Sequence, residues 1–216
     1  MRKQPHAALT GFIGLPTSPQ NPAIPAADGA PGIRYAYKAS LIGAAHQFEL
    51  TDTGLSWHIA GRSGLWAYDD ISAIRLSYRP VSMQSRRFRA DIGNSDGARL
   101  AILSTSWQSA ALMAPQDHDY RAFITALHER LAQAGSKAAL AGGLTSRVYG
   151  AALVLLTLVA IAMAGLLIRA VAVGEWAGVL FLAGFIALFA WQVGGFVGRN
   201  RPLAYSFDRL PNALLP

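Results

Sequence analysis

Five arginines close together in the chain are the side chains best suited to binding chemistry. They surround an expected β-hairpin between Ile74 and Ile92. They are Arg75, Arg79, Arg86, Arg87 and Arg89. In a regular strand Arg87 and Arg89 share a face and Arg86 points to the other. Beside a membrane they would form a basic patch for anionic lipid or a protein partner, each adding up to ~1 kcal/mol of attraction to the lipid. The alternative is an ordinary solvated strand face.

Nucleic acid is not an expected partner of these arginines. Phe88 is assigned to the core, and the sequence shows no set of aromatic residues on which bases could stack. The basic balance of the whole chain, with a formal net charge of +7, is better explained by an anionic lipid surface.

Other residues that could do chemistry fit structural roles better. His118 lies between Asp117 and Asp119. The side chains of adjacent residues at the start of a helix point in different directions, which favours helix capping over metal binding. Asp69 and Asp70 are adjacent, and neighbouring side chains on an extended chain point in opposite directions. They therefore indicate a turn rather than a pair of catalytic carboxylates. There is no cysteine, no nucleophile elbow and no phosphate-binding glycine loop. We therefore expect no metal, no cofactor and no enzyme activity.

Two long apolar segments dominate the organisation of the chain. They cover residues 148–168 and 176–198 and contain no Asp, Glu, Lys, Arg or His. Each approximates the ~20 residues that cross a bilayer as a helix. A buried helical pair in a soluble protein is the alternative, but neither segment has a polar stripe. Residues 169–175 between them suffice only for a turn, so the sequence predicts an antiparallel transmembrane hairpin.

The charges near the ends of the segments predict the orientation of the hairpin. Basic residues on the side of the chain termini are Lys137, Arg147, Arg199, Arg201 and Arg209, against Arg169 alone in the connecting loop. Positive residues collect on the cytoplasmic side, so both termini are expected in the cytoplasm. A cleaved signal peptide at the start of the chain would reverse this, but its apolar run is short and ends at Pro16.

The second apolar segment carries small residues three and four positions apart. They are Ala183, Ala187, Ala190, Gly194 and Gly198. Such a stripe allows close approach of another helix. Thr157, Ala160 and Ala164 offer a matching face on the first segment, so pairing within the hairpin is expected. Self-association of hairpins as a homo-oligomer is the alternative. The lack of ionisable residues disfavours an ion or proton path.

The region between the first residues and the hairpin has the pattern of a small β domain. Short runs of alternating apolar residues, separated by turn residues, indicate about seven strands from Ile33 onward. Phe48 to Leu50 and Leu55 to Ile59 flank a Thr-Asp-Thr-Gly turn and predict a hairpin. A helix with apolar residues at offsets of three and four begins at Asp117 or Asp119 and ends near Gly135. This pattern predicts a small barrel or two bent sheets closed by the helix.

Three stretches of this region resemble bacterial pleckstrin-homology-like domains. They are residues 48–57 (FELTDTGLSW), 65–76 (LWAYDDISAIRL) and 97–102 (GARLAI), followed by the terminal helix. The resemblance covers roughly residues 35–134 and implies an open barrel of strands capped by a C-terminal helix. The tail is similar to those of uncharacterised proteobacterial membrane proteins, which implies the bacterial inner membrane. Lipid specificity is not implied, because only Arg34 and Lys38 are basic near the first strand pair.

Taken together, the sequence predicts a mixed β and α-helical membrane protein. The expected parts are a disordered Pro/Ala/Gly-rich leader (1–32), a pleckstrin-homology-like domain (33–135), a linker (136–147), the first transmembrane helix (148–168), a loop (169–175), the second (176–198) and a basic cytoplasmic tail (199–216). The expected function is a membrane-anchored binding or adaptor module. The alternative is an accessory subunit of a transporter or envelope complex that acts through the hairpin.

Overall fold

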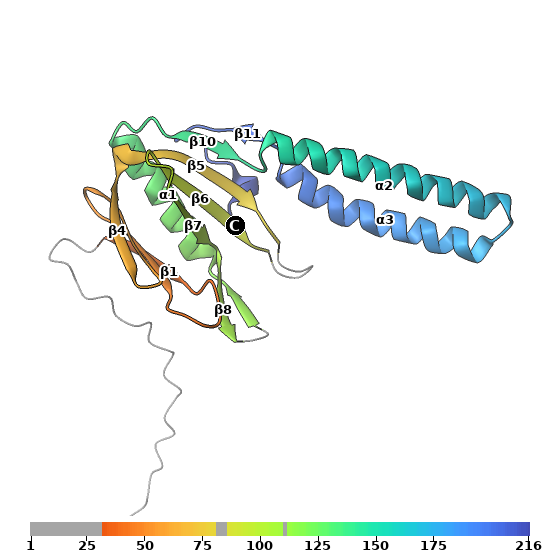
Figure 1. Cartoon of the computed structure of the whole chain (residues 1–216), viewed down its shortest axis with the longest axis horizontal. Helices are drawn as coiled ribbons and strands as arrows, with labels where there is room; N and C mark the ends of the chain where they lie inside the picture. The colour runs from red at the N-terminus through yellow and green to blue at the C-terminus, as the bar shows by residue number, and fades with distance from the viewer. Residues whose placement is uncertain (1–31, 81–85, 110–111) are drawn as a thin grey trace, which may run out of the picture. The chain divides into compact units, whose positions relative to one another are not determined.

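The computed structural model describes residues 32–80, 86–109 and 112–216. The leader predicted for residues 1–32 lies outside these ranges except for Gly32. Figure 1 shows the described strands and helices in chain order.

The first sheet contains four antiparallel strands in the order β1-β2-β3-β4. These are β1 (Ile33–Tyr37), β2 (His46–Leu50), β3 (Gly54–Ile59) and β4 (Arg62–Ala67). The predicted hairpin is confirmed as β2 and β3, which pair from Leu50↔Leu55 outward. Its turn is held by Thr51, whose hydroxyl donates to the Gly54 carbonyl at 2.9 Å and accepts from the Gly54 amide at 3.1 Å.

The second sheet has five strands in the order β11-β10-β5-β6-β7. After a 3-10 turn, η1 (Tyr68–Asp70), the chain forms β5 (Ile71–Tyr78), β6 (Phe88–Asn94) and β7 (Arg99–Leu103) as an antiparallel meander. Strand β10 (Ala139–Gly142) runs parallel to β5, and β11 (Leu203–Ala204) pairs antiparallel with β10. The edge of this sheet is thus built from segments on either side of the apolar hairpin.

A short hairpin and a long helix complete the β domain. The hairpin consists of β8 (Thr105–Ser109) and β9 (Leu112–Pro115), and the helix is α1 (Asp117–Gln133). The predicted helix is confirmed, but its expected capping by Asp117 or Asp119 is wrong, because the N-cap residue is Gln116 and Asp117 is already the first residue of the helix. Its residues Tyr120, Phe123, Ile124, Leu127 and Leu131 are almost completely buried in one core that includes residues of both larger sheets. Offsets of three and four place these side chains on one face, so burying that face fixes the helix against the sheets.

Two further helices correspond to the apolar segments. They are α2 (Ser146–Ala172) and α3 (Trp176–Arg199), joined by a turn at Gly174, and they lie antiparallel side by side (Figure 1). Their most apolar windows have mean hydropathies of 2.8 and 2.0, and neither window is buried inside the protein. Both helices are long and apolar enough to cross a membrane. Apolar helices with no protein cover on most of their surface are suited to lipid.

The structure differs from the expected domain in two respects. Within residues 33–135 the described strands number nine rather than about seven, and together with β10 and β11 they form sheets of four, five and two strands rather than the small barrel that was the first of the two expectations. In addition, the segment expected as a linker contains β10, and the expected tail contains β11 and a 3-10 turn, η2 (Asn212–Leu214). Leu214 and Leu215 of that tail are buried in the core. Strands of two and four residues show no alternation of their own, because only their pairing partners define them.

Candidate functional site

The end of β5 is tied to both ends of the hairpin. The Asn200 side chain is fully buried; its Oδ1 accepts from the Tyr78 amide at 3.1 Å and its Nδ2 donates to the Tyr78 carbonyl at 2.8 Å. On the α2 side, the Gly143 amide donates to the Leu76 carbonyl at 2.8 Å, and the Leu144 amide donates to the Asn200 carbonyl at 3.0 Å. These bonds hold the point where the helices leave the β domain against the end of strand β5.

Arginines gather around these bonds. The Arg79 amide donates to the Arg87 carbonyl at 2.8 Å, and Arg87 Nε donates to the Arg79 carbonyl at 3.3 Å. Partial burial and the neighbouring Arg89 and Arg79 lower the pKa of Arg87, although an arginine remains charged at neutral pH. The Arg199 guanidinium lies 5.0 Å from the centre of the Tyr78 ring. We define the basic collar as Arg79, Arg86, Arg87, Arg147, Arg199 and Arg201.

The outward face of the five-stranded sheet forms a second basic feature. Strand register places Ala139, Ala73, Gly93 and Arg99 side by side across four strands. The next outward row contains Ala141, Arg75, Asp91 and Ala101. Small side chains leave a groove of about 490 Å³ in this face. We define the sheet groove by its polar and small lining residues: Ala73, Arg75, Arg79, Arg89, Asp91, Gly93, Arg99, Ala101, Ala139, Ala141 and Thr145.

The charges of the sheet groove are only partly compensated. Arg89 donates to Asp91 Oδ1 from Nη2 at 2.5 Å and from Nε at 2.8 Å. Arg75 donates to the Gly143 carbonyl at 3.5 Å. Among the residues that the structure describes, no carboxylate lies within ion-pair distance of Arg75, Arg79 or Arg99. The groove therefore presents an excess of positive charge that suits an anion.

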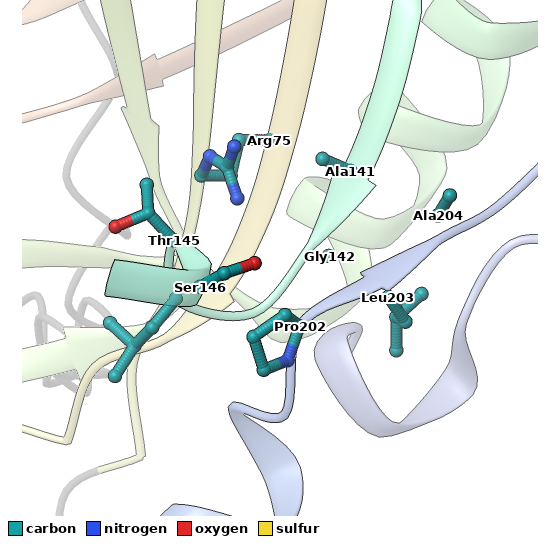
Figure 2. Close-up of a pocket in the computed structure, with 9 residues that line it drawn as sticks. Arg75, Ala141, Gly142, Thr145, Ser146, Pro202, Leu203 and Ala204 are labelled. Carbon is teal, nitrogen blue, oxygen red and sulfur yellow. The ribbon is translucent and has the colours of Figure 1, made fainter. Parts of the chain in front are cut away.

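A smaller cavity adjoins the groove at the start of α2. Its volume is about 320 Å³. Figure 2 shows Arg75, Thr145 and Ser146 at this cavity, with Pro202 and Leu203 of the returning chain nearby. Arg75, Ala141 and Thr145 line both spaces. Arg75 therefore lies between the open sheet face and the base of the first apolar helix.

The structure divides the predicted arginine patch into two parts. Arg75, Arg79 and Arg89 line the sheet groove, whereas Arg86 and Arg87 do not and belong to the collar at the end of the sheet. Sequence reasoning missed Arg99 and Asp91. A signal for Arg99 existed, because it alternates with the apolar Leu100 and Ile102 in the strand after the turn at 94–97, which places it on the outward face.

The residues predicted to have structural roles show no assembled site. His118 and Asp119 are exposed, and His118 Nδ1 lies 3.3 Å from Asp119 Oδ1. Asp69 and Asp70 lie in the turn η1 and are exposed. Within the described ranges no three His, Cys, Asp or Glu side chains are grouped so that they could hold a metal ion.

The small-residue stripe of α3 does not pair with α2. Ala183, Ala187, Ala190, Gly194 and Gly198 are all exposed. A Cβ added to either glycine would have no neighbouring atom within 4 Å. The partly buried face of α3 instead carries larger residues, namely Val179, Leu182, Ile186, Phe189 and Val193. The expected pairing through the stripe is therefore wrong within the hairpin, because the larger side chains make that contact.

Comparison with protein-family models, curated proteins and solved structures found no match to this chain.

Proposed function

We propose that this chain is a membrane-anchored binding module whose β domain is held at the surface of an anionic lipid leaflet. The observation that carries the proposal is the bonding of Tyr78 and Leu76 to residues at the two ends of the hairpin. This bonding keeps the basic collar next to the apolar helices. Each arginine near such a surface contributes up to ~1 kcal/mol of attraction. Binding, rather than catalysis, is the role we assign to the domain.

We also propose that the β domain has a pleckstrin-homology-like architecture. Support comes from the order of its parts: four antiparallel strands, three further antiparallel strands, the short β8–β9 hairpin, and then a helix packed into the shared core. In this proposal β10 and β11 are additions that attach the membrane hairpin to the edge strand β5.

The proposed orientation places the β domain and both termini in the cytoplasm of a bacterium, with the chain in the inner membrane. The absence of native cysteine allows a direct test. The test introduces a single cysteine at Ser95, in the β6–β7 turn, or at Gly174, between α2 and α3. Intact cells that contain each variant are then treated with a membrane-impermeant thiol reagent. We expect labelling at Gly174 only. Labelling at Ser95 only would reverse the orientation, and labelling at both would contradict a membrane crossing between them.

The lipid contact itself is tested on the full chain in nanodiscs. We expect backbone amides of residues 86–94 to exchange hydrogen more slowly in discs that contain phosphatidylglycerol than in discs of phosphatidylcholine alone. The double substitution Arg86→Gln and Arg87→Gln should remove this difference. Arg62→Gln is the matched control, since Arg62 is exposed on β4 and lies in the other sheet. Equal exchange of the wild-type chain in both kinds of disc would refute the proposal.

The exposed stripe on α3 favours one second candidate, an accessory subunit that acts through the hairpin. Replacing residues 148–197 with an unrelated hairpin keeps Arg147, Arg199 and Asn200 in place and separates the two functions. If the β domain carries the function, the swapped chain retains both the lipid-dependent exchange and its association with the partner. If the hairpin carries it, the swapped chain loses association with its partner in the membrane while the exchange pattern persists.

A further inference from the structure

We infer that the sheet groove is a binding site for the phosphate-bearing headgroup of an anionic phospholipid. This inference deepens the proposed function and rests on it, because it needs the β domain at the lipid surface. The two sites share only Arg79: the collar attracts the leaflet as a whole, whereas the groove would hold one headgroup.

The sheet groove combines an excess of cationic side chains with small residues on the sheet beneath them. Arg75 on β5 and Arg99 on β7 lie two strands apart and two residues apart along the strands, which corresponds to about 12 Å between their backbones. The other residues in the row of Arg99 are Ala139, Ala73 and Gly93, whose small side chains leave space above the sheet between the two arginines. Arginine guanidinium groups form paired hydrogen bonds with phosphate oxygens. A headgroup in the groove would reach such donors from two sides.

The lining of the sheet groove includes one acidic residue, Asp91. Asp91 is directly opposite Arg75 in the register of β5 and β6, yet its carboxylate is paired with Arg89. Arg75 is consequently left with a 3.5 Å hydrogen bond to the Gly143 carbonyl. The pairing on β6 neutralises the carboxylate and leaves Arg75 and Arg99 to attract an anion.

The place of the groove beside the start of α2 favours the membrane as the source of the anion. Thr145 lines the groove, and the next residue, Ser146, begins the apolar helix α2. The adjoining cavity continues from Arg75 to Ser146 (Figure 2). A lipid with its acyl chains beside the start of α2 would therefore bring its phosphate to Arg75 without leaving the bilayer. A soluble anion could bind without a groove beside the start of α2.

The experiment uses the full chain in a neutral detergent, with phosphatidylglycerol or phosphatidylcholine added, and counts retained lipids by native mass spectrometry. We expect selective retention of phosphatidylglycerol. The double substitution Arg75→Gln and Arg99→Gln should weaken that retention by about 10- to 30-fold. Arg62→Gln should leave it unchanged. A second pair, Arg75→Lys and Arg99→Lys, conserves the charge and should retain lipid to an intermediate extent, because lysine lacks the forked donor geometry.

The outcomes separate this inference from the proposed function. If the Arg75 and Arg99 pairs retain phosphatidylglycerol like the wild-type chain, the groove is not the headgroup site. If in addition Arg86→Gln with Arg87→Gln loses the lipid-dependent exchange, the proposed function stands and only the groove inference falls. A third arm adds inorganic phosphate and glycerol 3-phosphate without lipid. Binding of these anions through Arg75 and Arg99, with no selective lipid retention, would overturn the membrane as the source.

Discussion

The β domain and the apolar hairpin bury their residues in opposite ways. In the domain, α1 places one face in a core shared with two sheets, and residues as distant in sequence as Tyr35 and Leu214 are both nearly fully buried there. In the hairpin, neither helix has a buried residue. The domain therefore depends on specific contacts between side chains, whereas most of the hairpin surface requires only apolar surroundings. Substitutions in the two regions should differ accordingly.

The largest effect is expected in the tail that returns to the domain after the hairpin. Leu214 is completely buried, so Leu214→Ala leaves a cavity and should lower the free energy of unfolding by about 2–5 kcal/mol. Urea unfolding of the full chain in detergent, followed by tryptophan fluorescence, measures this loss. Leu65→Ala is the control, because Leu65 is 55% exposed on β4. Equal losses for both variants would mean that the tail does not belong to the core.

Substitution of two glycines, Gly143 before α2 and Gly174 between α2 and α3, allows the base of the hairpin to be compared with its loop. Gly143 and Gly174 both have φ of 74°, a left-handed conformation that costs alanine roughly 1–2 kcal/mol. A Cβ at Gly143 would collide with the carbonyl oxygens of Asn200 and Arg201, whereas a Cβ at Gly174 would meet no atom within 4 Å. Gly143→Ala should therefore cost about 1–3 kcal/mol more than Gly174→Ala.

The same unfolding measurement on the full chain compares the two glycine variants. Equal destabilisation would show that the close approach of the chain at the hairpin base contributes nothing beyond backbone conformation.

The third effect is a dependence of domain stability on pH. His128 is fully buried; its Nδ1 lies 2.7 Å from the Ile124 carbonyl and must donate to it, so Nε2 accepts from the Tyr205 hydroxyl at 3.0 Å. Burial lowers the pKa of His128, and its hydrogen bond to Ile124 opposes the shift only in part. Below the ordinary pKa of about 6.5, the unfolded chain binds a proton that the folded chain resists. The contribution to stability is therefore full above that pH and is lost as the pH falls below it.

His128→Gln should flatten the dependence of the unfolding free energy on pH below about 6.5. His118→Gln, at a largely exposed histidine, should leave the dependence unchanged. The contribution of His46 remains in both variants, because partial burial also lowers its pKa. An unchanged slope in His128→Gln would show that the pairing of His128 with the returning chain does not govern the acid sensitivity.

The smallest effect is expected on the exposed stripe of α3. Gly194→Ala adds a methyl group where nothing lies within 4 Å, and alanine is a better helix former by up to about 1 kcal/mol. Thermal unfolding of the monomeric chain should be unchanged or slightly shifted upward. Loss of stability, or weaker self-association in analytical ultracentrifugation, would instead show that another helix packs on the stripe.

Patterns along the chain were sufficient for the elements whose residues carry their own periodicity. Alternation in residues 46–50 and 54–59 around a Thr-led turn, the three-and-four spacing from Tyr120 to Leu131, and two uninterrupted apolar segments each specify an element locally. Local specification works there because the repeat of the apolar residues matches the repeat of the backbone. The arginines between Ile74 and Ile92 were likewise visible as a group, although not as two separate surfaces.

The sequence alone therefore determined that this chain combines a small β domain with two helices able to cross a membrane, and that the excess charge is basic. Only the tertiary structure decided how the two parts are joined. Residues 139–142 form strand β10 because they pair with the edge of β5, and β11 in turn pairs with β10. Asn200 has a structural role because its side chain hydrogen-bonds to both backbone groups of Tyr78. Arg99 joins Arg75 through the pairing of three strands. Such contacts join residues that are far apart in the sequence, so no local pattern of residues predicts them.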